Sequence, residues 1–211
     1  MADDPTSEQQ VKPGSSGVPY DQRLAGLLVR PLVGTPIHPN HLTVLSLAFG
    51  FGAAATFAWG DSPGWAALLY MLAVFTDHTD GELARQTGKT SRFGHYFDYV
   101  AGSLNYTALF LGLGIGLSNS WLGDWALVLG VAAALANPAV LLVRLVHERR
   151  HGEVAVAHPY AAGFEIEDFI YLIGPITWAG GVTYFFLVYG LGAIGYLLSQ
   201  IASLARSESR R

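Results

Sequence analysis

The chain has 211 residues, of which 51% are hydrophobic and only 13% are charged. Soluble domains carry roughly 25% charged residues, so this composition excludes an ordinary soluble protein and favours packed membrane helices. The net charge of −4 is small and says little about partners, but the sequence has no basic stripe for nucleic acid. Without cysteine it can form neither disulfides nor thiolate metal sites.

The N-terminal part of the chain is polar before it becomes apolar. Residues 1–19 are predicted to form a disordered cytoplasmic tail. Residues 20–33, YDQRLAGLLVRPLV, have an amphipathic pattern with Arg23 and Arg30 about two turns apart. They are predicted to form a juxtamembrane helix that lies along the membrane surface, the alternative being a polar leader into the first span.

Residues 38–205 are predicted to form one membrane domain of six helical spans. Apolar stretches near 20 residues long match the length that a hydrocarbon core of ~30 Å requires. The fold class is therefore an all-α integral membrane protein with an amphipathic surface helix before six transmembrane helices. The predicted spans are His41–Gly60, Gly64–Arg85, Phe93–Leu117, Trp121–Val146, Glu165–Ala179 and Val182–Leu204, followed by a short tail at 206–211. The fifth is the short one, and the alternatives for it are a tilted span or a segment that lies partly in the membrane interface.

The distribution of basic residues orients these spans. All 12 Lys and Arg residues fall in the tails or around the second and fourth loops, which share one side. The positive-inside rule places that side in the cytoplasm. All five tryptophans lie near the opposite ends of the spans, which is typical of an aromatic belt.

Three carboxylates interrupt the apolar pattern on the cytoplasmic side. Asp77 and Asp80 share one face of the second span, since they are three residues apart, and Asp98 lies near the start of the third. Carboxylates are costly in hydrocarbon and usually mark a working site there. If the two helix ends face each other, their oxygens would hold a hard divalent cation, Mg²⁺ or Mn²⁺.

These acids belong to a longer pattern, D-x2-D-G-x2-A-R-x8-G-x3-D, which resembles the signature of the CDP-alcohol phosphotransferase family of membrane enzymes. The resemblance implies transfer of a phosphate-linked alcohol from a CDP-linked donor to a lipid or small polar alcohol, with release of CMP. It also implies a homodimer and a catalytic role for the membrane domain. The implied metal ligands are Asp77, Asp80 and Asp98; the implied nucleotide-binding residues are Asp77, Asp80, Gly81, Ala84, Arg85, Gly94 and Asp98.

The sequence departs from the family pattern at one position. The pattern continues x3-D, where the family has its proposed general base, and this chain has Gly102 there. The acids of FEIED, which are Glu165, Glu167 and Asp168, are candidates for a replacement base at the cytoplasmic start of span five. The alternative is that these acids complement the helix dipole.

Other functions stay open at this point. Gly102 is also compatible with a catalytically impaired relative that keeps the nucleotide and metal site as a regulatory or partner subunit. A polyprenyl-diphosphate transferase usually needs more spans, and a cation-coupled transporter is expected to have acids near the bilayer midplane. We expect a multi-pass protein, in contact with membrane lipid in a bacterial inner membrane, whose active site faces the cytoplasm and which binds no nucleic acid.

Overall fold

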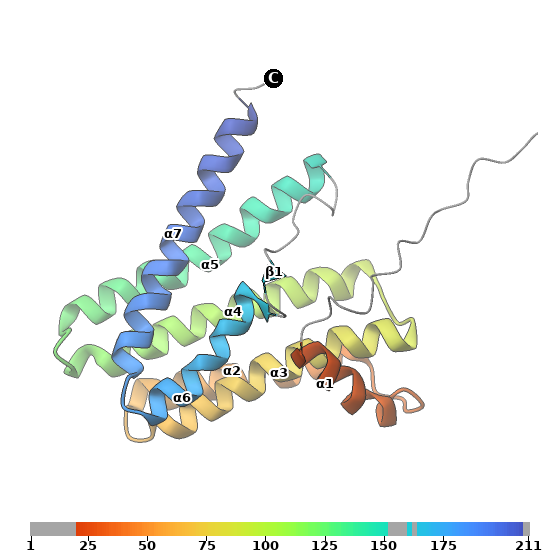
Figure 1. Cartoon of the computed structure of the whole chain (residues 1–211), viewed down its shortest axis with the longest axis horizontal. Helices are drawn as coiled ribbons and strands as arrows, with labels where there is room; N and C mark the ends of the chain where they lie inside the picture. The colour runs from red at the N-terminus through yellow and green to blue at the C-terminus, as the bar shows by residue number, and fades with distance from the viewer. Residues whose placement is uncertain (1–19, 152–159, 162–163, 209–211) are drawn as a thin grey trace, which may run out of the picture.

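The computed structural model describes residues 20–151, 160–161 and 164–208, and this part of the chain is almost entirely helical (Figure 1). The long helices are α2 (Pro39–Trp59), α3 (Pro63–Thr87), α4 (Arg92–Gly116), α5 (Asp124–His151) and α7 (Val182–Glu208). Shorter elements are α1 (Tyr20–Val29), η1 (Arg30–Leu32), η2 (Leu117–Asn119), β1 (Tyr160–Ala161), β2 (Phe164–Glu165), η4 (Ile166–Leu172) and α6 (Ile173–Trp178). The predicted tail at 1–19 lies outside the described residues, whereas 206–208 continue α7.

Helices long and apolar enough to cross a membrane confirm a helical membrane protein. Within the described residues there are four of them: Pro39–Trp59, Arg92–Asn119, Asp124–Val143 and Val182–Ala205. Helix α3 has 25 residues, which is enough to span, but Asp77, Asp80, Glu82 and Arg85 lower the hydropathy of its second half. The number of spans therefore stays a prediction.

Proline and glycine set the ends of the helices around the site. Pro39 and Pro63 open α2 and α3, where a missing N–H costs no hydrogen bond. Gly60 and Gly88 follow the last residues of these helices with φ of 80° and 66°, a left-handed conformation that glycine adopts without strain. The chain therefore reverses direction sharply at both ends of α3.

Glycines on α4 allow its neighbours to approach closely. A Cβ on Gly112 would overlap the backbone of Ala54 in α2, and one on Gly116 would overlap the carbonyl of Phe57. On another face of α4, a Cβ on Gly114 would lie 2.9 Å from the carbonyl oxygen of Ala126 in α5. Small residues of this kind are common where membrane helices pack.

The predicted fifth span is wrong in detail. Instead of one helix over Glu165–Ala179, β2 pairs with β1 and is followed by η4 and a six-residue α6. The apolar helical stretch covers only Phe169–Trp178, which is shorter than a bilayer core requires. Of the acids of FEIED, Glu165 lies in β2, and Glu167 and Asp168 lie in the first half of η4, before this apolar stretch.

Helix α1 packs against the second half of α3 (Figure 1). Ala25 and Val29 are fully buried, while Leu24, Leu27 and Leu28 are each more than half exposed. The Gln86 side-chain amide of α3 donates a 3.0 Å hydrogen bond to the carbonyl of Gly26. The predicted helix over 20–33 thus ends as an α-helix at Val29, and its place at a membrane surface stays a prediction.

Candidate metal centre

The carboxylates of Asp77, Asp80 and Asp98 come together in the structure, as the sequence predicted. One oxygen from each lies within 4.8 Å of the corresponding oxygens of the other two. Asp80 is buried, with 3% of its surface exposed, and the other two are partly buried. Three acids this close repel one another strongly unless a cation or protons compensate their charge.

Helix α2 is the scaffold that brings these acids together. It packs along both α3 and α4, whose mutual contact is small. The loop after Gly88 returns the chain to α4, where the Ser91 hydroxyl accepts a 2.9 Å hydrogen bond from the N–H of Gly94 and caps the helix. The second half of α3 and the first half of α4 therefore converge beside the start of α2.

Thr43 of α2 also belongs to this centre, although the sequence analysis did not predict it. Its hydroxyl is buried and donates a hydrogen bond to Oδ2 of Asp80. A lone threonine in a helix carries no sign of its partner in the sequence. The bond orients Asp80 while leaving its other oxygen for a ligand.

We expect Thr43→Val to weaken divalent-cation binding about tenfold, because removing a partner of a metal ligand typically costs 10–100-fold in affinity. Calorimetric titration of the purified protein with Mn²⁺ measures the change. Thr56→Val is the matched control, since the Thr56 hydroxyl donates only within α2, to the carbonyl of Gly52 at 2.8 Å. Equal Mn²⁺ affinity in both variants would contradict a role for Thr43.

A chain of buried hydrogen bonds also links helices α2, α3 and α4 to one another. The Asn105 amide on α4 donates to the hydroxyl of Ser46 on α2 at 2.9 Å, and that hydroxyl donates to the carbonyl of Ala73 on α3 at 2.9 Å. Gly50 makes room, because a Cβ there would overlap the Asn105 side chain. This interhelical bonding links α4, α2 and α3 and fixes the relative positions of the acid-bearing helices along their axes.

The donor set fits a hard divalent cation. Mg²⁺ holds oxygen ligands at 2.0–2.1 Å, so oxygens on opposite sides of the ion are about 4.2 Å apart. Separations of at most 4.8 Å therefore need only small side-chain rotations to close around an ion. Among the described residues these three aspartates are the group of metal-ligating side chains that meets this geometry.

The other residues of the motif surround the acids. Gly81 follows Asp80 on α3, and Ala84 and Arg85 lie one turn further along. Gly94 lies one turn before Asp98, and a Cβ there would be 3.5 Å from Oδ1 of Asn40 at the start of α2. Gly102 lies one turn after Asp98, and a Cβ there would meet no atom within 4 Å.

The candidate replacement bases are the acids of FEIED, before the apolar part of η4. The side chains of Glu165, Glu167 and Asp168 lie outside the described part of the structure, and only their backbone is defined, in β2 and η4. The end of η4 does reach α3, since the hydroxyl of Tyr171 lies 3.5 Å from Nδ1 of His78. His78 therefore faces the end of η4.

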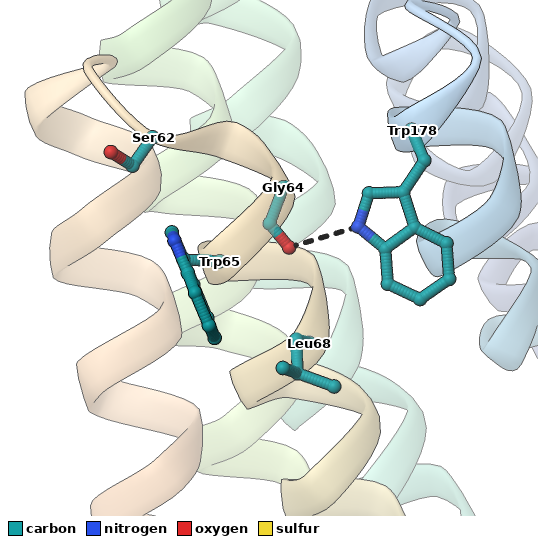
Figure 2. A pocket seen from close by; sticks show the side chains of 5 residues that line it. All are labelled: Ser62, Gly64, Trp65, Leu68 and Trp178. Atoms are coloured by element: carbon teal, nitrogen blue, oxygen red, sulfur yellow. Dashed lines mark hydrogen bonds between the residues drawn. The ribbon is translucent and has the colours of Figure 1, made fainter.

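A cavity of about 320 Å³ lies elsewhere, between the first turn of α3 and the end of α6. Figure 2 shows Trp65 and Trp178 on its two sides, with Trp178 Nε1 donating to the carbonyl of Gly64 at 3.2 Å. Gly64 precedes Asp77 by 13 residues, or about 20 Å of helix, so this cavity is separate from the acids. Each of the five tryptophans is more than half exposed at this end of the helices, as a membrane-interface belt would require.

The fold and the site define a class: a helical membrane protein in which two helix ends present three carboxylates to one position. A model of the CDP-alcohol phosphatidyltransferase family matches residues 36–202. The chain belongs to this family, which confirms the resemblance drawn from the motif. Family membership and the cluster of three aspartates support a divalent-cation site.

Individual relatives match the chain over shorter segments. The chain is 40% identical over 88 residues to CDP-diacylglycerol–glycerol-3-phosphate 3-phosphatidyltransferase of Cereibacter sphaeroides, covering 40% of each protein. It is 29% identical over 92 residues to archaetidylinositol phosphate synthase of Pyrococcus horikoshii, covering 44% of this chain and 48% of the relative. The matched segments thus span less than half the length of these relatives.

A solved structure shares most of the fold. The crystal structure of Mycobacterium tuberculosis phosphatidylinositol phosphate synthase with CDP-DAG bound superposes with a TM-score of 0.67, over 85% of this chain and 92% of that one. The sequences are 15% identical, so this likeness concerns the fold alone.

Proposed function

We propose that this protein transfers a phosphatidyl or other phosphoalcohol group from a CDP-linked donor to an acceptor hydroxyl and releases CMP, in the synthesis of phospholipids or related phosphodiesters. The observation that carries this proposal is the convergence of Asp77, Asp80 and Asp98 within 4.8 Å, in a chain that belongs to the family. The names of the relatives support the same substrate class, since one is a CDP-diacylglycerol–glycerol-3-phosphate 3-phosphatidyltransferase and the other an archaetidylinositol phosphate synthase.

Each part of the site has a task in this reaction. Asp77, Asp80 and Asp98 would hold Mg²⁺ or Mn²⁺, which supplies neutralisation of the diphosphate charge. Arg85 offers a planar fork of N–H donors to a phosphate. Gly81 and Ala84 leave the aspartate face of α3 open, so that a diphosphate can approach the backbone.

The transfer itself needs one proton to leave the acceptor. The acceptor oxygen forms a bond to the phosphorus of the transferred group, while the bond from that phosphorus to the departing CMP oxygen breaks. The hydroxyl proton passes to a base, for which Glu165, Glu167 and Asp168 are the candidates in place of a carboxylate at position 102. Phosphoryl transfer relies mainly on positioning and charge neutralisation, so a weak or distant base slows the reaction without preventing it.

The membrane setting extends the proposal. Six spans with α1 along the surface would place the acids at the cytoplasmic face, where nucleotides are available. The 12 basic residues on the same side as the acids support this orientation. A homodimer in a bacterial inner membrane is part of the same proposal.

The deciding experiment supplies the purified protein with CDP-diacylglycerol and a panel of acceptors: glycerol phosphate, inositol phosphate, serine and lipid alcohols. We expect release of CMP with at least one acceptor when Mg²⁺ or Mn²⁺ is present, and loss of this activity in EDTA that Mn²⁺ restores. Cation-dependent binding of the donor without any turnover would instead favour the regulatory or partner subunit that Gly102 suggests. Failure to bind CDP-linked donors with either cation would overturn both functions.

A further inference from the structure

The carboxylate of Glu82 accepts hydrogen bonds from two side chains of its own helix, Arg85 and Gln86. Its Oε2 accepts a hydrogen bond from Nε of Arg85 at 2.9 Å and pairs with Nη2 of the same guanidinium at 2.8 Å. Its Oε1 accepts a hydrogen bond from Nε2 of Gln86 at 2.9 Å. The side chain of Glu82 is 20% exposed and that of Arg85 is 57% exposed, so the carboxylate is the more fixed partner.

The pairing of Glu82 with Nε and Nη2 leaves Nη1 of Arg85 on the side of Gly81. Nη1 of Arg85 lies 3.6 Å from the point that a Cβ on Gly81 would occupy. Gly81 directly follows Asp80 on α3. Glu82 thus engages one side of the planar group and leaves Nη1 beside the open aspartate face.

Helix α1 fixes the position of Glu82 in turn. Gln86, which donates to Glu82, also donates to the carbonyl of Gly26 at 3.0 Å. A Cβ on Gly26 would lie only 3.3 Å from Oε1 of Glu82, so the backbone of α1 packs directly beside the carboxylate. Since Ala25 and Val29 are fully buried on either side, this part of α1 has little room to shift.

We propose that Glu82, braced by Gln86 and the backbone of α1, is a positioning residue that presents the Arg85 guanidinium to the diphosphate of the donor. The inference rests on the proposed function and deepens it. An exposed ion pair one turn apart contributes little to stability, so the value of this pair is geometric. The pairing of Nε and Nη2 with Glu82 restricts the rotation of the Arg85 side chain. Less conformational entropy is therefore lost when the donor binds.

The test is a double-mutant cycle on donor recognition. Glu82→Ala is expected to raise the KM for CDP-diacylglycerol about fivefold while kcat stays within about twofold, because a contact made equally in ground and transition states appears in KM. In an Arg85→Ala background, the same substitution is expected to add no further increase, because Glu82 acts through Arg85. Asp61→Ala, in the loop after α2 at the other end of the molecule, controls for the loss of one negative charge.

The dissociation constant of CDP in saturating Mg²⁺ is measured in parallel, so that the inference is decided even in a protein without turnover. An unchanged KM and CDP affinity in Glu82→Ala, or effects that multiply fully in the double variant, would overturn it while leaving the proposed function intact. A wild-type protein that neither turns over donor nor binds CDP would overturn both. Matched melting temperatures of wild type and Glu82→Ala exclude a merely structural effect.

Discussion

Asp98→Asn is expected to lower CMP release about 10³-fold or more and to abolish cation-dependent binding of CDP. The substitution keeps the shape of the side chain but removes one of three charges that lie within 4.8 Å. It therefore removes one of the charged ligands for the cation that neutralises the diphosphate. Losing a single electrostatic contact of this kind commonly costs 10²–10³-fold, and losing a metal ligand costs more. Activity with a CDP-linked donor, assayed over a range of Mn²⁺ concentrations, measures the effect.

The same substitution has an opposite expected effect on the metal-free protein. Without a cation, the three carboxylates repel one another, so Asp98→Asn is expected to leave thermal stability unchanged or to raise it. Mn²⁺ is expected to stabilise the wild type by binding the folded state, but not the variant. Asp124→Asn, at the first residue of α5, is the control and should retain the Mn²⁺ response. An undiminished Mn²⁺ response in Asp98→Asn would contradict the assignment of the metal ligands.

Residue spacing alone predicted that Asp77 and Asp80 share a face of α3. The proximity of Asp98 to them depends on the tertiary fold. Asp77 and Asp80 must share a helix face because they are three residues apart, and the structure confirms this. That Asp98 faces them depends on the turn after Gly88 and on α2, which packs against both helices. The resemblance to the family motif predicted that the three aspartates meet. Hydropathy alone predicts only that the two helix ends lie on the same side of the membrane.

The residues that sequence reasoning missed are those whose role is a contact between helices. Thr43 bonds to Asp80 from a helix 37 positions earlier in the chain. Glu82 was assigned to a variable position of the motif, although its spacing to Arg85 already allowed an ion pair within one turn. Nothing in the sequence, however, indicates that α1 packs beside this pair.

The continuous helix predicted over 165–179 is replaced in the structure by β2, η4 and α6. FEIED is followed by about ten apolar residues, half of what a bilayer core requires. Gly174 and Pro175 lie within this stretch, and the observed α-helix is confined to Ile173–Trp178. Glu167 and Asp168 thus lie inside the 3-10 segment η4 instead of the first turn of a long helix, so complementing the dipole of such a helix no longer explains them.

Gly102→Asp is expected to raise kcat, by about 10²-fold if the missing general base limits the rate. Position 102 lies one turn after Asp98, and a Cβ there would meet no atom within 4 Å, so a carboxylate has room. General base catalysis typically contributes 10²–10⁴-fold, which sets the size of the expected gain. Turnover with a saturating acceptor measures kcat directly.

Gly102→Asn separates this chemical effect from a change in the helix. Both substitutions replace a helical glycine and are expected to stabilise α4 by a few tenths of a kcal/mol, but only the aspartate can accept a proton. We also expect Glu167→Gln or Asp168→Asn to slow the wild type while sparing donor binding, and to matter less once Gly102→Asp is present. Equal kcat in Gly102→Asp and Gly102→Asn would show that proton removal is not limiting. The rate of this family member would then depend on charge neutralisation at the three aspartates.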